Sequence, residues 1–110
     1  MPPMGDASEK DFQTRVMRFA REHGWMVFHP APSQVRPGVW RTDGSGFPDL
    51  VMAHVWKGVL FAELKTDTGR MSREQAGWRW RLSAAGASWC LWRPRHLQDG
   101  TITRELKEIA

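Results

Sequence analysis

Apolar residues recur at helical and strand spacing along most of the chain. Near the N-terminus, a spacing of three or four residues places four apolar side chains on one helical face: Phe12, Val16, Phe19 and Ala20. We expect this helix to begin with Ser8 as its N-cap and to end at Gly24. Ser72 and Gln75 have the spacing of a capping box and predict a second helix that extends to about Ala85. A last helix is expected over 103–109.

Short apolar runs between turn-forming residues predict strands at 25–29, 47–54, 59–65 and 88–92. The helix between the last two runs would act as a crossover, so the strand at 88–92 should pair in parallel with an earlier strand. The expected fold is α/β, a mixed sheet of about four strands flanked by helices. Its elements would follow in the order helix, strand, strand, strand, helix, strand, helix.

The segment 30–46 interrupts this pattern. It contains three prolines and three glycines, and long irregular segments within compact domains are usually functional or disordered. We expect a short strand at 39–42 and mobility elsewhere in the segment. Residues 1–7 are expected to be disordered, and 8–110 to form one domain.

Composition favours an intracellular protein with a polyanionic partner. The net charge is +4 and the isoelectric point is about 10.0, values that suit nucleic acid. The sequence contains neither a secretory signal nor an apolar run long enough to span a membrane, so we expect a cytoplasmic protein that does not use a membrane. The single cysteine, Cys90, excludes an internal disulfide framework and a cysteine-based zinc cluster, and is expected to be a small buried hydrophobe.

Between 70 and 95, six arginines accompany a single acid and a group of tryptophans: Trp78, Trp80, Trp89 and Trp92. Such a pattern could grip phosphates and stack on bases. The tryptophans could equally fill the core, and we favour this alternative because a small domain needs large side chains for its interior.

Two acids and a lysine lie where buried strands are expected to end. Glu63 and Lys65 share a face of their strand because strand side chains alternate. A hairpin turn centred on residue 56 would pair Asp49 with Glu63, and one centred on residue 57 would pair Asp49 with Lys65. Either odd-length turn would bring the three side chains together on one face, whereas a two-residue turn would separate them.

Two close carboxylates repel each other unless a cation lies between them. Oxygen ligands suit Mg²⁺ or Mn²⁺, and Lys65 could then hold a water molecule or stabilise charge on a phosphate. The same residues could instead form a surface ion-pair cluster. Glu9 lies one helical turn before Phe12, so it could support the metal or simply stabilise the helix start.

Taken together, these motifs resemble a known family. Gly46-Phe47-Pro48-Asp49, Glu63-Leu64-Lys65 and a following helical Gln75 resemble the PD-(D/E)xK nuclease superfamily. The closest resemblance is to its VRR-NUC domain in the small stand-alone form of phages and bacteria, and it covers residues 8–94.

The resemblance implies a restriction-endonuclease-like core and a nuclease that depends on Mg²⁺ or Mn²⁺. Asp49, Glu63 and the backbone carbonyl of Leu64 would bind the metal, and Lys65 would be catalytic. Glu9 would support the site from its helix. Gln75 would be the motif glutamine, a role compatible with its place in the capping box. Stand-alone members are similar to Holliday-junction resolvases, which implies a homodimer acting on branched DNA.

Outside this constellation, the residues expected to contact DNA are basic or polar side chains near the predicted site: His29, Arg36, Arg41, Ser45, Arg70 and Arg73. Simple solubility is the alternative role for the arginines. The sequence therefore predicts a metal-dependent DNA endonuclease. Two alternatives remain, namely a non-catalytic nucleic-acid-binding module with a nuclease fold and a nuclease acting on single-stranded DNA or RNA.

Overall fold

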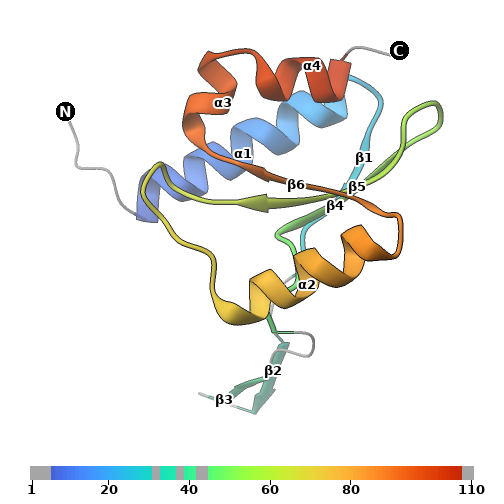
Figure 1. Cartoon of the computed structure of the whole chain (residues 1–110). Helices are drawn as coiled ribbons and strands as arrows, with labels where there is room; N and C mark the ends of the chain where they lie inside the picture. Colours follow the sequence, from blue (N-terminus) through green and yellow to red (C-terminus); the bar gives the residue numbers. More distant parts are fainter. Residues whose placement is uncertain (1–5, 31–32, 37–38, 42–44, 108–110) are drawn as a thin grey trace.

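The computed structural model describes residues 6–30, 33–36, 39–41 and 45–107 (Figure 1). Along the chain its elements are α1 (Asp6–Glu22), β1 (Met26–Phe28), β2 (Ser33–Arg36), β3 (Val39–Arg41), β4 (Leu50–His54), β5 (Gly58–Leu64), α2 (Arg73–Ala84), β6 (Ser88–Trp92), α3 (Pro94–Gln98) and α4 (Thr101–Lys107). Within these ranges, no helix is long and apolar enough to cross a membrane.

Four strands form a mixed sheet in the order β1-β4-β5-β6. β1 pairs with β4, and β4 with β5, in antiparallel register, while β5 pairs with β6 in parallel. The fold class is therefore confirmed, as is the parallel pairing expected for the last strand. In Figure 1, α1, α3 and α4 cover one face of this sheet and α2 lies against the other.

The core lies between the sheet and the helices α1 and α4. The predicted stripe on α1 is buried at Phe12, Val16 and Ala20, because these positions return to the same helical face. Ile102 and Leu106 of α4 are also buried. The sheet contributes the alternate residues that face these helices, namely Leu50, Met52, Leu60, Ala62, Leu64 and Trp92. A hydrogen bond from Trp25 Nε1 to the carbonyl of Leu106, at 2.9 Å, joins the start of β1 to the last helix.

Several element boundaries differ from those predicted. α1 begins at Asp6, so Ser8 lies within the helix and is not its N-cap; the same finding removes residues 6 and 7 from the expected disordered N-terminus. Gly24 follows the helix as expected and adopts a φ of 88°, which glycine tolerates best. Residues 1–5 lie outside the described part of the chain.

The helix expected at 103–109 is present as α4, which begins two residues earlier, at Thr101; positions 108–109 of that prediction lie outside the described part of the chain. A separate helix, α3, precedes it and was not predicted. α3 begins at Pro94, a residue whose fixed φ suits the first helical turn. Gly100, with a φ of 86°, then separates it from α4.

In the irregular segment, the expected strand at 39–42 is present as β3, and it pairs with the unpredicted strand β2. Residues 31–32, 37–38 and 42–44 of this segment lie outside the described residues, and its mobility stays a prediction.

Candidate active site

The turn between β4 and β5 determines which acids meet. Leu50 pairs with Ala62 and His54 with Gly58, so the three-residue turn is centred on Trp56. Continuing this register by one residue places Asp49 opposite Glu63, the first of the two predicted alternatives. Asp49 is fixed by a hydrogen bond from the Leu64 amide to its Oδ2, at 2.8 Å.

Glu63 is an ionisable side chain inside the fold, with only 2% of its surface exposed. Its pKa is raised from 4.5 to about 9, mainly by burial and also by a hydrogen bond with the adjacent Asp49 carboxyl and by charge repulsion from it. Lys65 acts in the opposite direction, while Glu9 adds weak repulsion. In the metal-free protein Glu63 therefore retains its proton near neutral pH, and a divalent cation would displace that proton.

Lys65 emerges at the end of β5 beside this pair. Its amide donates to the carbonyl of Trp92 at 3.0 Å, which extends the parallel pairing with β6 by one residue. Its side chain is half-buried and is close enough to Glu63 to lower the pKa of that carboxyl. Lys65 is thus held near Glu63 by a strand end that β6 supports.

Gln75 forms the expected capping box and also contacts the acidic pair, while its role as the motif glutamine stays a prediction. Its Oε1 accepts a hydrogen bond from the Ser72 amide at 2.7 Å, and Ser72 Oγ accepts from the Gln75 amide at 3.1 Å. These two bonds form the capping box of α2. At the same time Gln75 Nε2 donates to Glu63 Oε1 at 3.2 Å. One side chain therefore joins the start of α2 to the acidic pair.

α2 is held against the turn that precedes Asp49. The rings of Phe47 and Trp78 meet edge to face with centroids 4.8 Å apart, and Trp78 Nε1 donates to the carbonyl of Ser45 at 3.1 Å. This close approach requires glycine at position 46, because the Cβ of any other residue would lie only 2.6 Å from the Gln75 backbone nitrogen and would clash with it. The packing of Phe47 against α2 was not predicted, although its aromatic side chain between Gly46 and Pro48 could have indicated such a contact.

The oxygen atoms at this sheet edge suit a hard divalent cation. Asp49 and Glu63 supply carboxylates on adjacent strands, and the raised pKa of Glu63 reflects charge that a cation would offset. In the described ranges, no three His, Cys, Asp or Glu side chains gather as a ready metal cluster. A bound ion would therefore need other oxygen atoms, such as the expected Leu64 carbonyl and water. Glu9, exposed on α1, acts on Glu63 only weakly.

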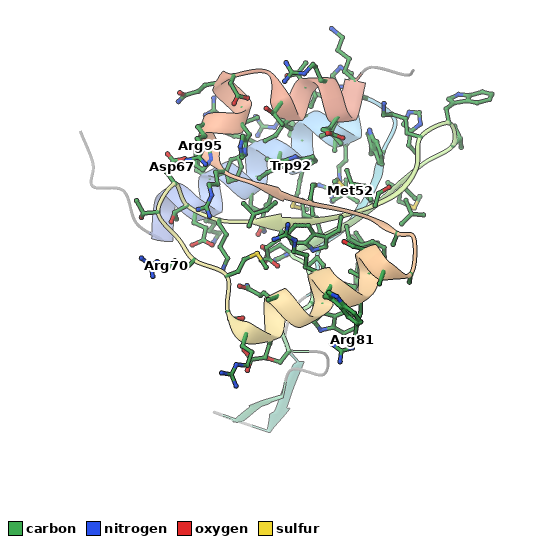
Figure 2. The ribbon with its side chains drawn as sticks, in the orientation of Figure 1. Met52, Asp67, Arg70, Arg81, Trp92 and Arg95 are labelled. Carbon is green, nitrogen blue, oxygen red and sulfur yellow. The ribbon has the colours of Figure 1, made fainter. Side chains whose placement is uncertain are left out.

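The expected DNA-contact residues are placed unevenly. His29 Nδ1 donates to the carbonyl of Asp49 at 2.8 Å, so this side chain adjoins the acidic pair. Arg70 and Arg73 are exposed on the loop before α2 and on its first turn. Figure 2 shows Arg70 at the same end of the sheet as the N-terminal part of α1. For Arg36 and Arg41 only the backbone, in β2 and β3, belongs to the described part.

A groove of about 460 Å³ runs along α2 beside the Phe47 contact. Two arginines, a glutamate and a tryptophan stand out among the residues that line it: Ser45, Arg73, Glu74, Gly77, Trp78 and Arg81. Because Ser45 belongs to the turn that leads to Asp49, this groove starts close to the acidic pair. It offers cationic and aromatic groups to a strand of nucleic acid.

The tryptophans do not follow a single pattern. Trp92 and Trp25 are buried in the core, whereas Trp80 and Trp56 are 68% and 78% exposed. Trp78 and Trp89 are half-buried, and the Arg79 guanidinium lies over the Trp89 ring.

Cys90 packs against the core as predicted, and burial raises the pKa of its thiol.

Comparison with known proteins gives one consistent result. No protein-family model matches the sequence, and no curated protein does. Two solved structures are similar across most of the chain at 17% identity. A "VRR_NUC domain" has a TM-score of 0.63 and aligns 84% of this chain with 92% of its own. A "VRR_NUC domain protein" has a TM-score of 0.60, with 93% and 97% aligned.

The chain has the fold of a VRR_NUC domain. The resemblance drawn from the sequence motifs is thereby confirmed at the level of the fold. Within this VRR_NUC fold, Asp49, Glu63 and Lys65 gather at one end of the central strands, with Gln75 bonded to the acidic pair.

Proposed function

We propose that this protein is a divalent-metal-dependent endonuclease that hydrolyses phosphodiester bonds in branched DNA. The observation that carries the proposal is the contact between Asp49 and the buried Glu63 beside Lys65. A buried carboxyl beside a second acid is costly for a fold to maintain unless it has a role. A buried Glu63 with a raised pKa is what a cation-binding pair displays before the cation binds.

Each site residue has a distinct task in this proposal. Asp49, Glu63 and the Leu64 carbonyl would hold Mg²⁺ or Mn²⁺, which supplies Lewis-acid stabilisation of the phosphate. Gln75 orients the Glu63 carboxylate through its Nε2 hydrogen bond. Lys65 holds the attacking water or neutralises the charge that develops on the phosphate. Glu9 tunes the charge of the site from α1.

Nucleic acid is the substrate class that the surface favours. The isoelectric point of about 10.0 indicates a polyanionic partner. The groove along α2 is lined by Arg73, Arg81 and Trp78, so phosphates and a sugar or base could be held together. His29 donates through Nδ1 to the Asp49 carbonyl, and in the doubly protonated ring the N–H at Nε2 could donate to a phosphate.

A second copy of the chain is the partner we propose for the sheet face beside α2. Met26, Ala53 and Val59 are in register on β1, β4 and β5 and therefore share one face. Met26 is 80% exposed and Val59 51%, and Phe28 on the same strand as Met26 is 63% exposed. Apolar side chains gathered in this way are typical of an interface between protein chains.

The test is cleavage of a four-way junction beside linear duplex and single strands of the same sequence. Each substrate is incubated with Mg²⁺, Mn²⁺ or EDTA, with Lys65→Ala as the inactive control. Paired, symmetric nicks in the junction alone support a dimeric structure-selective enzyme. Cleavage of every substrate would leave a general nuclease. Absence of metal-dependent cleavage would overturn the proposal and favour a binding module.

The exposure of Trp80 favours a second candidate, a nuclease acting on single strands. The Arg81 guanidinium lies 5.8 Å from the centroid of the Trp80 ring, so the two groups form an aromatic and cationic surface on α2. Competition between single strands and junctions for the metal-free protein separates the two candidates. Preference for single strands, lost in Trp80→Ala, would support the second.

A further inference from the structure

The loop between β5 and α2 connects two residues of the proposed site. It begins after Lys65 and runs through residues 66–71 to Ser72, the N-cap of α2. Gln75 lies one turn into that helix and bonds to Glu63. The conformation of this loop therefore sets the position of Lys65 relative to the acidic pair.

Arg93, just after β6, holds the loop from the neighbouring strand. Its Nη1 donates to the carbonyl of Thr66 at 2.6 Å and to the carbonyl of Gly69 at 2.8 Å. Both bonds join a cationic donor to a neutral acceptor, which makes them stronger than ordinary backbone contacts. The side chain is half-buried, so solvent competes less for these bonds.

The anchored loop lies directly against the side chain of Lys65. A Cβ placed on Gly69 would lie 3.5 Å from Lys65 Cδ, within van der Waals contact. The same Cβ would lie 3.0 Å from Thr66 Oγ1. The absence of a side chain at Gly69 thus lets the loop backbone pass close to the aliphatic part of Lys65. Arg93 fixes the same backbone by its hydrogen bond to the Gly69 carbonyl.

The parallel pairing of the two strands supports this arrangement. Leu64 pairs with Trp92, so Lys65 and Arg93 are the next residues along adjacent strands. The Lys65 amide donates to the Trp92 carbonyl at 3.0 Å. The backbone of Lys65 is therefore fixed by β6, and its side chain by the loop that Arg93 anchors.

We infer that Arg93 is a positioning residue for Lys65 in the proposed nuclease reaction. It acts through the carbonyl groups of Thr66 and Gly69 and does not itself touch the substrate. This inference rests on the proposed function, in which Lys65 holds water or neutralises the phosphate. Loss of the two hydrogen bonds would let the loop and the ammonium move, with the acidic pair left in place.

The experiment compares Arg93→Met with Arg95→Met. Arg95 is exposed, and its contact with Asp67 uses the backbone nitrogen, so its side chain is a matched control. Figure 2 shows Arg95 and Asp67 next to each other beside the same loop. We expect Arg93→Met to lower kcat on the best DNA substrate about 10- to 100-fold. KM and the binding affinity of the metal-free protein should stay within about twofold, as losses confined to the reacting state do.

Chemical rescue separates positioning from general support of the fold. Free guanidinium added to Arg93→Ala should restore part of kcat, because it can donate to the same two carbonyls. Arg93→Lys should fall between Arg93→Met and the native protein. Unchanged kcat in Arg93→Met would overturn the inference. Equal losses of binding affinity and kcat, with no rescue, would also overturn it.

Hydrogen exchange of the loop provides a measurement independent of catalysis. The Gly69 amide donates to the Thr66 carbonyl at 3.3 Å, within the anchored loop. Its exchange should be faster in Arg93→Met than in Arg95→Met, and equal exchange would refute anchoring by Arg93. A native protein that cleaves no substrate would refute the proposed function, and this exchange rate would still decide the anchoring.

Discussion

Replacing Glu63 by glutamine is expected to stabilise the metal-free protein at neutral pH. In the unfolded chain the carboxyl ionises near pH 4.5, whereas burial in the fold raises its pKa to about 9. Between these values the folded protein holds one proton more than the unfolded chain. The free energy of unfolding therefore falls as pH rises through this window.

The size of the effect follows from the same pKa values. Each pH unit above 4.5 lowers the free energy of unfolding by about 1.4 kcal/mol, so the loss caused by Glu63 is at most about 3 kcal/mol at pH 7. Because the protein can relax around the ionised carboxyl, we expect an observed difference of about 1–3 kcal/mol. Glutamine has no such cost. Its amide can donate to Asp49 and accept from Gln75, so the hydrogen bonds of Glu63 are retained.

The assay is urea unfolding in EDTA at pH 5, 7 and 8.5, with Glu22→Gln as a control at an exposed glutamate. The difference between Glu63→Gln and the native protein should be small at pH 5 and increase at each higher pH. Mg²⁺ should raise the stability of the native protein and leave the variant unchanged. A variant that is less stable at pH 7, or a difference independent of pH, would refute the raised pKa of Glu63.

Three further substitutions test the site. Lys65→Met should lower the cleavage rate about 10²- to 10⁴-fold in single-turnover assays while circular dichroism and melting stay native; a folded variant that still cuts would remove Lys65 from the mechanism. Gln75→Glu retains the capping box but places a third carboxylate beside Glu63, so Mg²⁺ affinity by calorimetry should rise about 10-fold, and unchanged affinity would count against the Glu63 bond. Gly46→Ala should cost about 1–3 kcal/mol in urea unfolding, because of its φ of 86° and the contact with α2; native stability would contradict that contact.

The parts of the fold that depend on local periodicity could be predicted from the sequence. The stripe of α1 and the capping box of α2 are local patterns, and both are present. The hairpin arithmetic reduced the pairing of Asp49 to two registers. It could not choose between them, because the centre of the turn depends on side-chain hydrogen bonds that residue spacing does not reveal. Two of those contacts are the bonds from the amides of Trp56 and Lys57 to His54 Nδ1.

The contacts that complete the candidate site join segments far apart in the sequence. Gln75 reaches Glu63 across the loop, and Trp78 reaches Ser45 across 33 residues. Neither partner can be identified from spacing, because the approach depends on how α2 packs on the sheet. The start of α1 was missed for a different reason. Ser8 matched the local cap pattern, yet the helix extends two residues before it.

α2 contains no fully buried residue, although it carries the hydrogen bond to Glu63. Its attachment depends on half-buried contacts such as the edge-to-face rings of Phe47 and Trp78. Elements with few buried side chains open at lower free energy than the core. Warming should therefore detach this helix before the sheet melts, so enzymatic activity would disappear several degrees below the unfolding transition. DNA bound along α2 would stabilise the attached helix, so activity would be lost at a higher temperature, closer to that of the unfolding transition.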